Sequence, residues 1–153
     1  MTALKALSIK QPWCHRILFE GKDVENRSWP TKFRGPVLIH ASKSPIGMAE
    51  CRELGAPLGG IVGLAYITDC VTRMDSQWFF GKYGFVLRNA RPCQFIPMKG
   101  QLSFFQTDIS IDNLEFISGA DQYDYKYPER IVRKPAQKAP PKPQLENPQQ
   151  TLI

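Results

Sequence analysis

The chain has 153 residues, of which 42% are hydrophobic and 22% carry a charge. This length and composition suit one globular domain with a hydrophobic core. No apolar run approaches the roughly 18 residues that a membrane-spanning helix needs, and the first residues lack the apolar stretch of a signal peptide. We therefore expect a cytoplasmic protein with no membrane partner.

The net charge of +6 is spread unevenly along the chain. Residues 1–105 carry 14 Lys and Arg against 7 Asp and Glu, whereas residues 106–125 carry five acids and no base. Residues 126–153 carry six bases and two acids. A basic domain favours an anionic partner such as a nucleic acid, although a charge of this size does not establish one.

The four cysteines lie far apart and form no C-x-x-C pair. Structural zinc sites usually contain such close ligand pairs. We therefore interpret the cysteines as buried, reduced thiols and expect neither a metal nor another cofactor. They are Cys14, Cys51, Cys70 and Cys93.

The first half of the chain alternates strand and helix signals. Pro12 suits the first turn of a helix whose apolar residues recur four positions apart, and Gly21 is expected to end it. Ser44 and Pro45 are typical of a second helix start, and Gly55 of its end. Between and before these helices the sequence predicts strands at residues 3–9, 22–29 and 35–42.

The second half is mainly β-type. Residues 59–71 alternate apolar and polar positions, and two further strands are expected at 83–93 and 102–110, separated by Pro97 and Gly100. The order is strand, helix, strand, strand, helix and three strands. Many strands with two helices favour an α+β fold with a small closed or half-open barrel over a doubly wound parallel sheet.

The end of the chain differs in composition from the rest. Residues 123–153 form a tail rich in Pro, Lys and Gln, and the domain is expected to occupy residues 1–122. The tail has too few aromatic and branched side chains to offset the entropy of ordering, so we expect it to be disordered. It is also a possible docking segment for a protein partner.

The stretch GKDVENRSW, residues 21–29, is unusually charged for a strand. Because alternate residues of a strand share a face, Glu25 and Arg27 are expected to point together and Lys22 to point the other way. One interpretation is a structural ion pair between Glu25 and Arg27. The other is the polar floor of a cleft.

Other candidate binding residues lie around this stretch. Lys10 and Gln11 stand at a strand-to-helix junction, where free backbone N–H groups favour an anion. Trp29 is either a rim aromatic that stacks an unpaired base or a cap on the barrel. Arg34, Ser42 and Lys43 are candidates for phosphate contacts.

Several blocks of the sequence occur in an order that is similar to a known family. They are Gln11-Pro12-Trp13, Gly21-Lys22, Glu25 with Arg27 and Trp29, Arg34-Gly35, Ile39 to Ser42, Gly60 to Val71, Tyr83 to Pro92 and Pro97 to Leu102. Together they resemble the ASCH domain, a family of the PUA-like superfamily. The resemblance implies a small β-barrel of about six strands with two flanking helices, and a cleft that binds RNA or single-stranded nucleic acid.

The resemblance also raises an enzymatic alternative. One bacterial ASCH-type group hydrolyses N4-acetylcytidine with a Lys, a Thr and a Glu, and another ASCH protein has been described as a ribonuclease. Lys22 matches the hydrolase lysine, but Glu25 replaces the threonine, and a carboxylate is no substitute for a hydroxyl nucleophile. No later carboxylate can be assigned to the third role by motif, although Asp69 lies on a plausible strand. We favour a binding module, with a hydrolase that uses Lys22 and Glu25 as the alternative.

Overall fold

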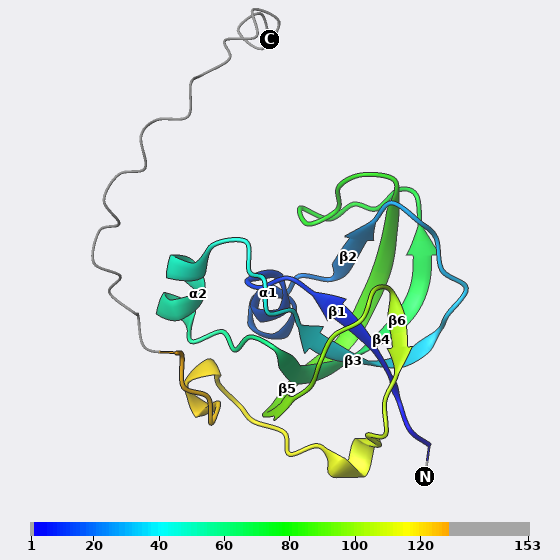
Figure 1. The fold of residues 1–153 in the computed structure, drawn as a ribbon. Coiled ribbons are helices and arrows are strands. Elements are labelled where there is room, and N and C mark those ends of the chain that lie inside the picture. Colours follow the sequence, from blue (N-terminus) through cyan, green and yellow to red (C-terminus); the bar gives the residue numbers. More distant parts are fainter. Residues whose placement is uncertain (1, 129–153) are drawn as a thin grey trace, which may run out of the picture.

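The computed structural model describes residues 2–128. Six strands form one sheet in the order β2-β5-β4-β3-β1-β6, and two helices lie beside it (Figure 1). The strands are β1 (Lys5–Ile9), β2 (Val24–Arg27), β3 (Gly35–Ala41), β4 (Gly60–Val71), β5 (Tyr83–Pro97) and β6 (Phe104–Gln106). The helices are α1 (Trp13–Phe19) and α2 (Met48–Leu54), and two 3-10 turns follow at Ile111–Asn113 and Ala120–Gln122. The expected α+β class and element order are confirmed.

Several boundaries differ from the expectation: β2 covers Val24–Arg27 of the expected 22–29, and β6 covers only Phe104–Gln106 of the expected 102–110. Helix α2 begins after Gly47 and not at Ser44, because the Ser44 N–H donates to the Ser42 hydroxyl and the Ile46 N–H donates to the Gln11 carbonyl. These bonds hold the segment before the helix in a turn. Strand β5 continues to Pro97, because the antiparallel pairing with β4 extends along its whole length.

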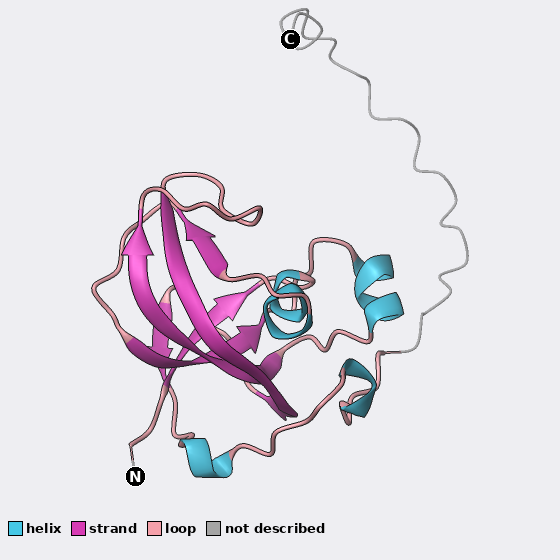
Figure 2. Cartoon of the chain, turned by 180° about the vertical axis from the view of Figure 1, so that it is seen from behind, coloured by secondary structure: helices cyan, strands magenta, loops and turns pink. Residues whose placement is uncertain are grey.

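The sheet curls until its two edge strands face each other. Arg27 on β2 donates from Nη2 to the carbonyl of Ser8 on β1, at 2.9 Å, although these strands are not neighbours in the sheet. Trp29, just beyond β2, packs edge to face on Phe104 of β6, with ring centroids 5.9 Å apart. The strong curvature is clear in the view from behind (Figure 2). The result is a half-open barrel, in line with the small β-barrel that the resemblance implied. Side-chain contacts, and no backbone ladder, join its two edges.

Both faces of the curled sheet are buried at strands β1 and β3. Leu7 and Ile39 pack with Ile17 of α1 in one hydrophobic cluster, inside the curve. Ala6 and Leu38, the alternate residues of the same strands, belong to a second cluster on the other face. A strand covered on both faces is apolar along its whole length, which explains the continuous hydrophobic run of β3.

The segment from residue 107 to residue 128, which we call the C-terminal strap, runs from β6 back to α2 (Figure 1). The Tyr123 hydroxyl donates to the Val62 carbonyl at 2.6 Å, and the Tyr127 hydroxyl donates to the Cys51 carbonyl at 2.7 Å. The packed part of the chain therefore extends past the expected domain end at residue 122. The prediction of a disordered tail otherwise concerns residues 129–153, which lie outside the described residues. None of the helices within residues 2–128 is long and apolar enough to cross a membrane.

Candidate functional site

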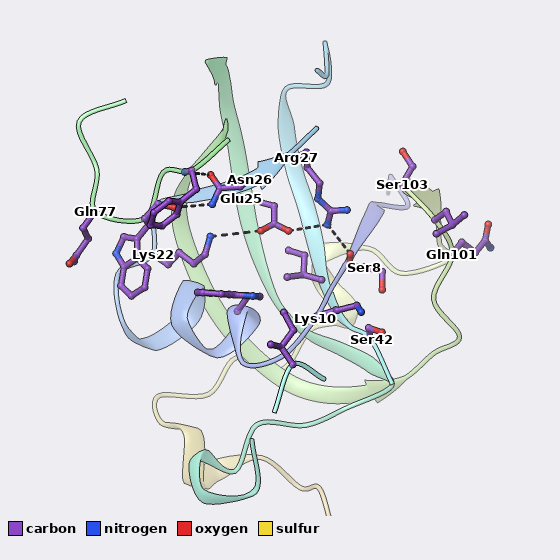
Figure 3. A pocket seen from close by; sticks show the side chains of 16 residues that line it. Ser8, Lys10, Lys22, Glu25, Asn26, Arg27, Ser42, Gln77, Gln101 and Ser103 are labelled. Carbon is purple, nitrogen blue, oxygen red and sulfur yellow. Dashed lines mark hydrogen bonds and ion pairs between the residues drawn. The ribbon is translucent and has the colours of Figure 1, made fainter. Parts of the chain in front are cut away.

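A pocket of about 740 Å³ opens where β1, β2, the start of α1, loop 72–82 and turn 98–103 meet (Figure 3). We call it the central pocket. Its polar lining residues are Ser8, Lys10, Lys22, Glu25, Asn26, Arg27, Ser42, Gln77, Gln101 and Ser103, and its apolar ones are Ile9, Trp13, Ile46, Trp78, Phe80 and Leu102. A cavity of this size with a few convergent polar groups is typical of a ligand site.

Three charged side chains form a row along the floor of the central pocket (Figure 3). Lys22 Nζ lies 3.8 Å from Glu25 Oε1, and Arg27 Nη2 donates to Glu25 Oε2 at 2.9 Å. Lys22 and Glu25 are only 4% and 7% exposed. Buried charges are tolerated when they are paired, so the carboxylate between two cations is what keeps all three in place.

Lys22 does not point away from Glu25 as strand alternation predicted. Strand β2 begins at Val24, so Lys22 precedes it, and Gly21 turns the chain there with φ +75°. The Lys22 ammonium folds back and donates to the carbonyl of Val24. The prediction was wrong because alternation holds only for residues inside the strand.

Burial lowers the pKa of the Lys22 ammonium, and the Glu25 carboxylate opposes this effect by favouring the charged form. The ammonium also lies 5.4 Å from the centre of the Trp13 ring, a cation–π distance. Lys22 is thus a desolvated cation held between a carboxylate and an aromatic ring.

Loop 72–82 brings two aromatic residues to the central pocket, and Asn26 holds it there. Asn26 Nδ2 donates to the carbonyl of Trp78 at 2.9 Å, and its Oδ1 accepts from the N–H of Phe80 at 3.0 Å. The Ser76 hydroxyl of the same loop donates to Asp23 at 2.6 Å. Residues on and just before β2 therefore fix the loop as well as the floor.

The mouth of the central pocket is apolar and accessible. Phe80 is 67% exposed, Leu102 96% and Ile46 54%. A cluster of large exposed apolar side chains around a polar floor is typical of an interaction site. The pocket therefore combines apolar contact area with a charged floor.

A second hollow of about 980 Å³ continues from the central pocket and shares Ser8, Ser42, Gln101 and Leu102 with it. We call it the lysine groove, because Lys43 and Lys99 line it and both are exposed. The two hollows form one path across the open side of the half-barrel.

His40 lies at the base of the lysine groove but is held by the fold. Its Nε2 donates to the Met98 carbonyl at 2.7 Å, and its Nδ1 lies 3.0 Å from the Ser8 hydroxyl. Burial lowers the pKa of His40, although the bond to Met98 favours the protonated form. A neutral ring with Nε2–H satisfies both partners, so His40 is a structural residue.

Most of the residues that the sequence indicated come together. Lys10, Lys22, Glu25, Arg27 and Ser42 line the central pocket, and Lys43 lines the lysine groove.

Three other indicated residues, Gln11, Trp29 and Arg34, lie outside the central pocket and the lysine groove. Gln11 is buried, and its side chain donates to the Pro57 carbonyl. The Trp29 ring packs on Phe85, with centroids 5.2 Å apart, in the manner of a barrel cap.

Arg34 and Asp69 lie apart from the central pocket and face each other. Arg34 Nη2 is 3.7 Å from Asp69 Oδ1, and both side chains are exposed. Asp69 therefore does not supply a third group beside Lys22 and Glu25, and Glu25 is the carboxylate of the described pocket lining.

Sequence reasoning missed the residues that the loops contribute, above all Trp78, Phe80, Ile46 and Leu102. The signal was present in SQWFFGK, residues 76–82, where three aromatic residues occur in a segment between two strands. Loops that carry large apolar side chains at the surface are frequent carriers of function.

The cysteines contribute nothing to the pocket. All four thiols are free, and Cys14, Cys51 and Cys93 are buried as expected, whereas Cys70 is only partly buried. Burial raises the pKa of the Cys93 thiol to about 12, so it stays protonated and unreactive. Within residues 2–128, no three His, Cys, Asp or Glu side chains gather as metal ligands would.

Comparison with known proteins agrees with this architecture. The family model of the ASCH domain matches residues 7–132, which includes both helices, the strap and the whole sheet except the first two residues of β1. No curated protein matches the sequence closely. Since the family model covers most of the chain, and the six-stranded half-barrel with two helices has the expected form, the chain belongs to the ASCH domain family.

Proposed function

We propose that the protein binds RNA or single-stranded nucleic acid in the cytoplasm, with an unstacked base in the central pocket and the backbone along the lysine groove. The observation that carries the proposal is the buried row of Lys22, Glu25 and Arg27 on the floor of an apolar-rimmed pocket. Proteins that read unpaired bases combine aromatic or apolar walls with hydrogen-bonding groups for the base edge.

The lysine groove supplies the second half of this interaction. Lys43 and Lys99 carry positive charge next to the pocket mouth, where the phosphates on either side of an inserted base would pass. Exposed cations attract phosphates without regard to sequence, and the counterions that they displace make binding sensitive to salt. The pocket and the groove thus have separate roles.

The experiment is a salt titration of binding to a fluorescent single-stranded RNA. We expect the affinity to fall steeply between about 50 and about 200 mM salt, and the slope of log K against log salt to shrink by about 0.7 for each lost phosphate contact. Lys43→Gln and Lys99→Gln should each reduce the slope. Lys126→Gln, an exposed position on the strap, is the matched control. Absent binding, or binding that ignores salt, contradicts the proposal.

A hydrolase is the second candidate, and one observation favours it. The pKa of Lys22 is lowered by burial beside a carboxylate, which brings a lysine closer to service as a base. Against it, Glu25 occupies the threonine position and no second carboxylate lines the described pocket. Incubation with N4-acetylcytidine and with labelled single-stranded RNA tests this, since turnover that disappears in Lys22→Ala would establish the enzyme.

A protein partner for the C-terminal tail remains a separate prediction. The Pro and Lys residues that motivate it lie beyond Pro128, outside the described part of the chain. Deleting residues 134–153 should abolish capture of such a partner while nucleic-acid binding by the pocket persists. A partner that is captured equally by the shortened chain would contradict the prediction.

A further inference from the structure

The floor of the central pocket presents its hydrogen-bonding groups in a fixed order (Figure 3). Lys22 and Arg27 can only donate, because an ammonium and a guanidinium have no free lone pair. The Glu25 carboxylate lies between these two donors and accepts. The row therefore reads donor, acceptor, donor from Lys22 to Arg27.

Each member of the row keeps capacity for a ligand. Lys22 has three N–H groups, of which one is directed to the Val24 carbonyl. Glu25 Oε1 lies 3.8 Å from the ammonium, which is an ion-pair distance but too long for a hydrogen bond. Arg27 uses Nη2 for Glu25 and for the Ser8 carbonyl.

The rest of the Arg27 guanidinium is underused. Among the described residues its Nε is a buried donor with no partner. Arg27 has five N–H groups in all, and the two bonds from Nη2 leave those of Nη1 for a ligand in the pocket. Because Nε is enclosed by protein atoms, Nη1 is the donor that this end of the row offers to a ligand.

The complement of this row is an edge that offers acceptor, donor and acceptor in sequence. Uracil and thymine have that edge, in O4, N3–H and O2. Cytosine would place the lone pair of its N3 against the Glu25 carboxylate. Guanine would place a second donor against Arg27, and adenine has no third group. We propose that the central pocket selects uracil, or thymine in DNA, through the imide edge of an unpaired base.

This selectivity rests on the proposed function, since the base must come from an unpaired strand. The imide edge is the one used in base pairing, so a paired base cannot offer it to the row. The aromatic residues of the lining, Trp13, Trp78 and Phe80, give contact area that every base can use. Selection among the bases therefore depends on the row of Lys22, Glu25 and Arg27 and not on the aromatic walls of the pocket.

The test compares short single-stranded RNAs that differ only in the central nucleotide, which is uridine, cytidine, adenosine, guanosine or 3-methyluridine in a run of adenosines. Fluorescence anisotropy gives the affinities. We expect uridine to bind about tenfold more tightly than cytidine, which is the size of one good base-edge recognition. The methyl group of 3-methyluridine removes the N3 donor, and it should remove the whole preference.

The outcomes separate the inference from the proposed function. Equal, salt-sensitive binding of uridine and 3-methyluridine overturns the selectivity and leaves nucleic-acid binding intact. A preference for cytidine or a purine also overturns it. No binding to any of the RNAs overturns both proposals.

A variant tests the role of Glu25 directly. Gln at position 25 has an amide that can donate as well as accept, so the Glu25→Gln variant can meet the N3 lone pair of cytosine. The preference for uridine over cytidine should shrink towards one, whereas Glu53→Gln, on the exposed side of α2, should keep it. An unchanged preference in folded Glu25→Gln contradicts the proposal, and if this variant does not fold, 3-methyluridine decides the question.

Discussion

Lys22 and Glu25 are almost completely buried, and each lies beside a group of opposite charge. Buried ion pairs add little net stability, but removing one member of the row destabilises the fold, because it leaves a buried charge without a partner. The fold therefore maintains a charged floor that does not depend on a bound ligand. A preformed site loses less freedom on binding than one that must be ordered.

The two histidines make stability depend on pH. Burial lowers the pKa of His40 and of His15 below 6.5, the ordinary value. In acid the unfolded chain takes up these protons before the folded chain does, so the free energy of unfolding should fall as the pH drops below 6.5 towards the folded pKa values. Above that range the contribution is constant.

Urea unfolding at a series of pH values between about 5 and about 8 measures this effect. His40→Gln should reduce the pH dependence, because one of the two uptake sites is lost. Equal slopes for the variant and the unchanged protein would show that His40 is protonated as easily in the folded state as in the unfolded one.

At the scale of elements, the short strand β2 positions both the floor of the central pocket and loop 72–82. Glu25 and Arg27 form the floor of the central pocket, while Asn26 between them ties down loop 72–82. The two tasks use opposite faces of one strand, as the period of two requires. The aromatic wall and the charged floor are thus fixed by the same short strand.

Hydrogen exchange of the Phe80 amide tests this tie. Asn26→Ala removes the acceptor of the Phe80 N–H, and the exchange of this amide should speed up by about fivefold, the loss of one hydrogen bond of about 1 kcal/mol. Asn26→Asp is the control, since a carboxylate keeps the acceptor for Phe80 while it loses the donor to the Trp78 carbonyl. Slow exchange in Asn26→Ala would mean that the loop is held by other contacts.

At the scale of the whole molecule, the C-terminal strap supplies a hydrogen-bond donor at an irregularity of the sheet. The pairing of β4 with β5 shifts between Ile61 and Gly63, so the carbonyl of Val62 has no place in the regular ladder. Tyr123 supplies the missing donor. The C-terminal strap therefore belongs to the stability of the domain, although it forms no strand of the sheet.

Tyr123→Phe isolates that contribution. It removes the hydroxyl and keeps the ring, so we expect a loss of about 1–2 kcal/mol in the free energy of unfolding. Tyr125→Phe is the control, because the Tyr125 ring packs on Phe95 and its change leaves the bond to Val62 in place. Equal midpoints in thermal unfolding for Tyr123→Phe and the unchanged protein would contradict the prediction.

The sequence predicted best what is decided locally. Pro12 and Gly21 delimit α1 as expected, because caps and apolar spacing act within one turn. The composition of the pocket was predicted only in part, since Trp78 and Leu102 reach it through turns whose course depends on long-range pairing. The direction of the Lys22 side chain was predicted wrongly because β2 begins only at Val24, so Lys22 lies before the strand and outside its alternation.

The open side of the half-barrel has a thermodynamic consequence. The central pocket takes its floor from β2 and other walls from β1 and the turn before β6, two regions that the sheet order leaves at or near opposite edges. A nucleotide that contacts both regions would connect two parts of the sheet that no backbone hydrogen bonds join directly. Because a ligand that binds only the folded state stabilises it by mass action, occupancy should slow the opening of both sheet edges together, so recognition and mechanical closure become one event.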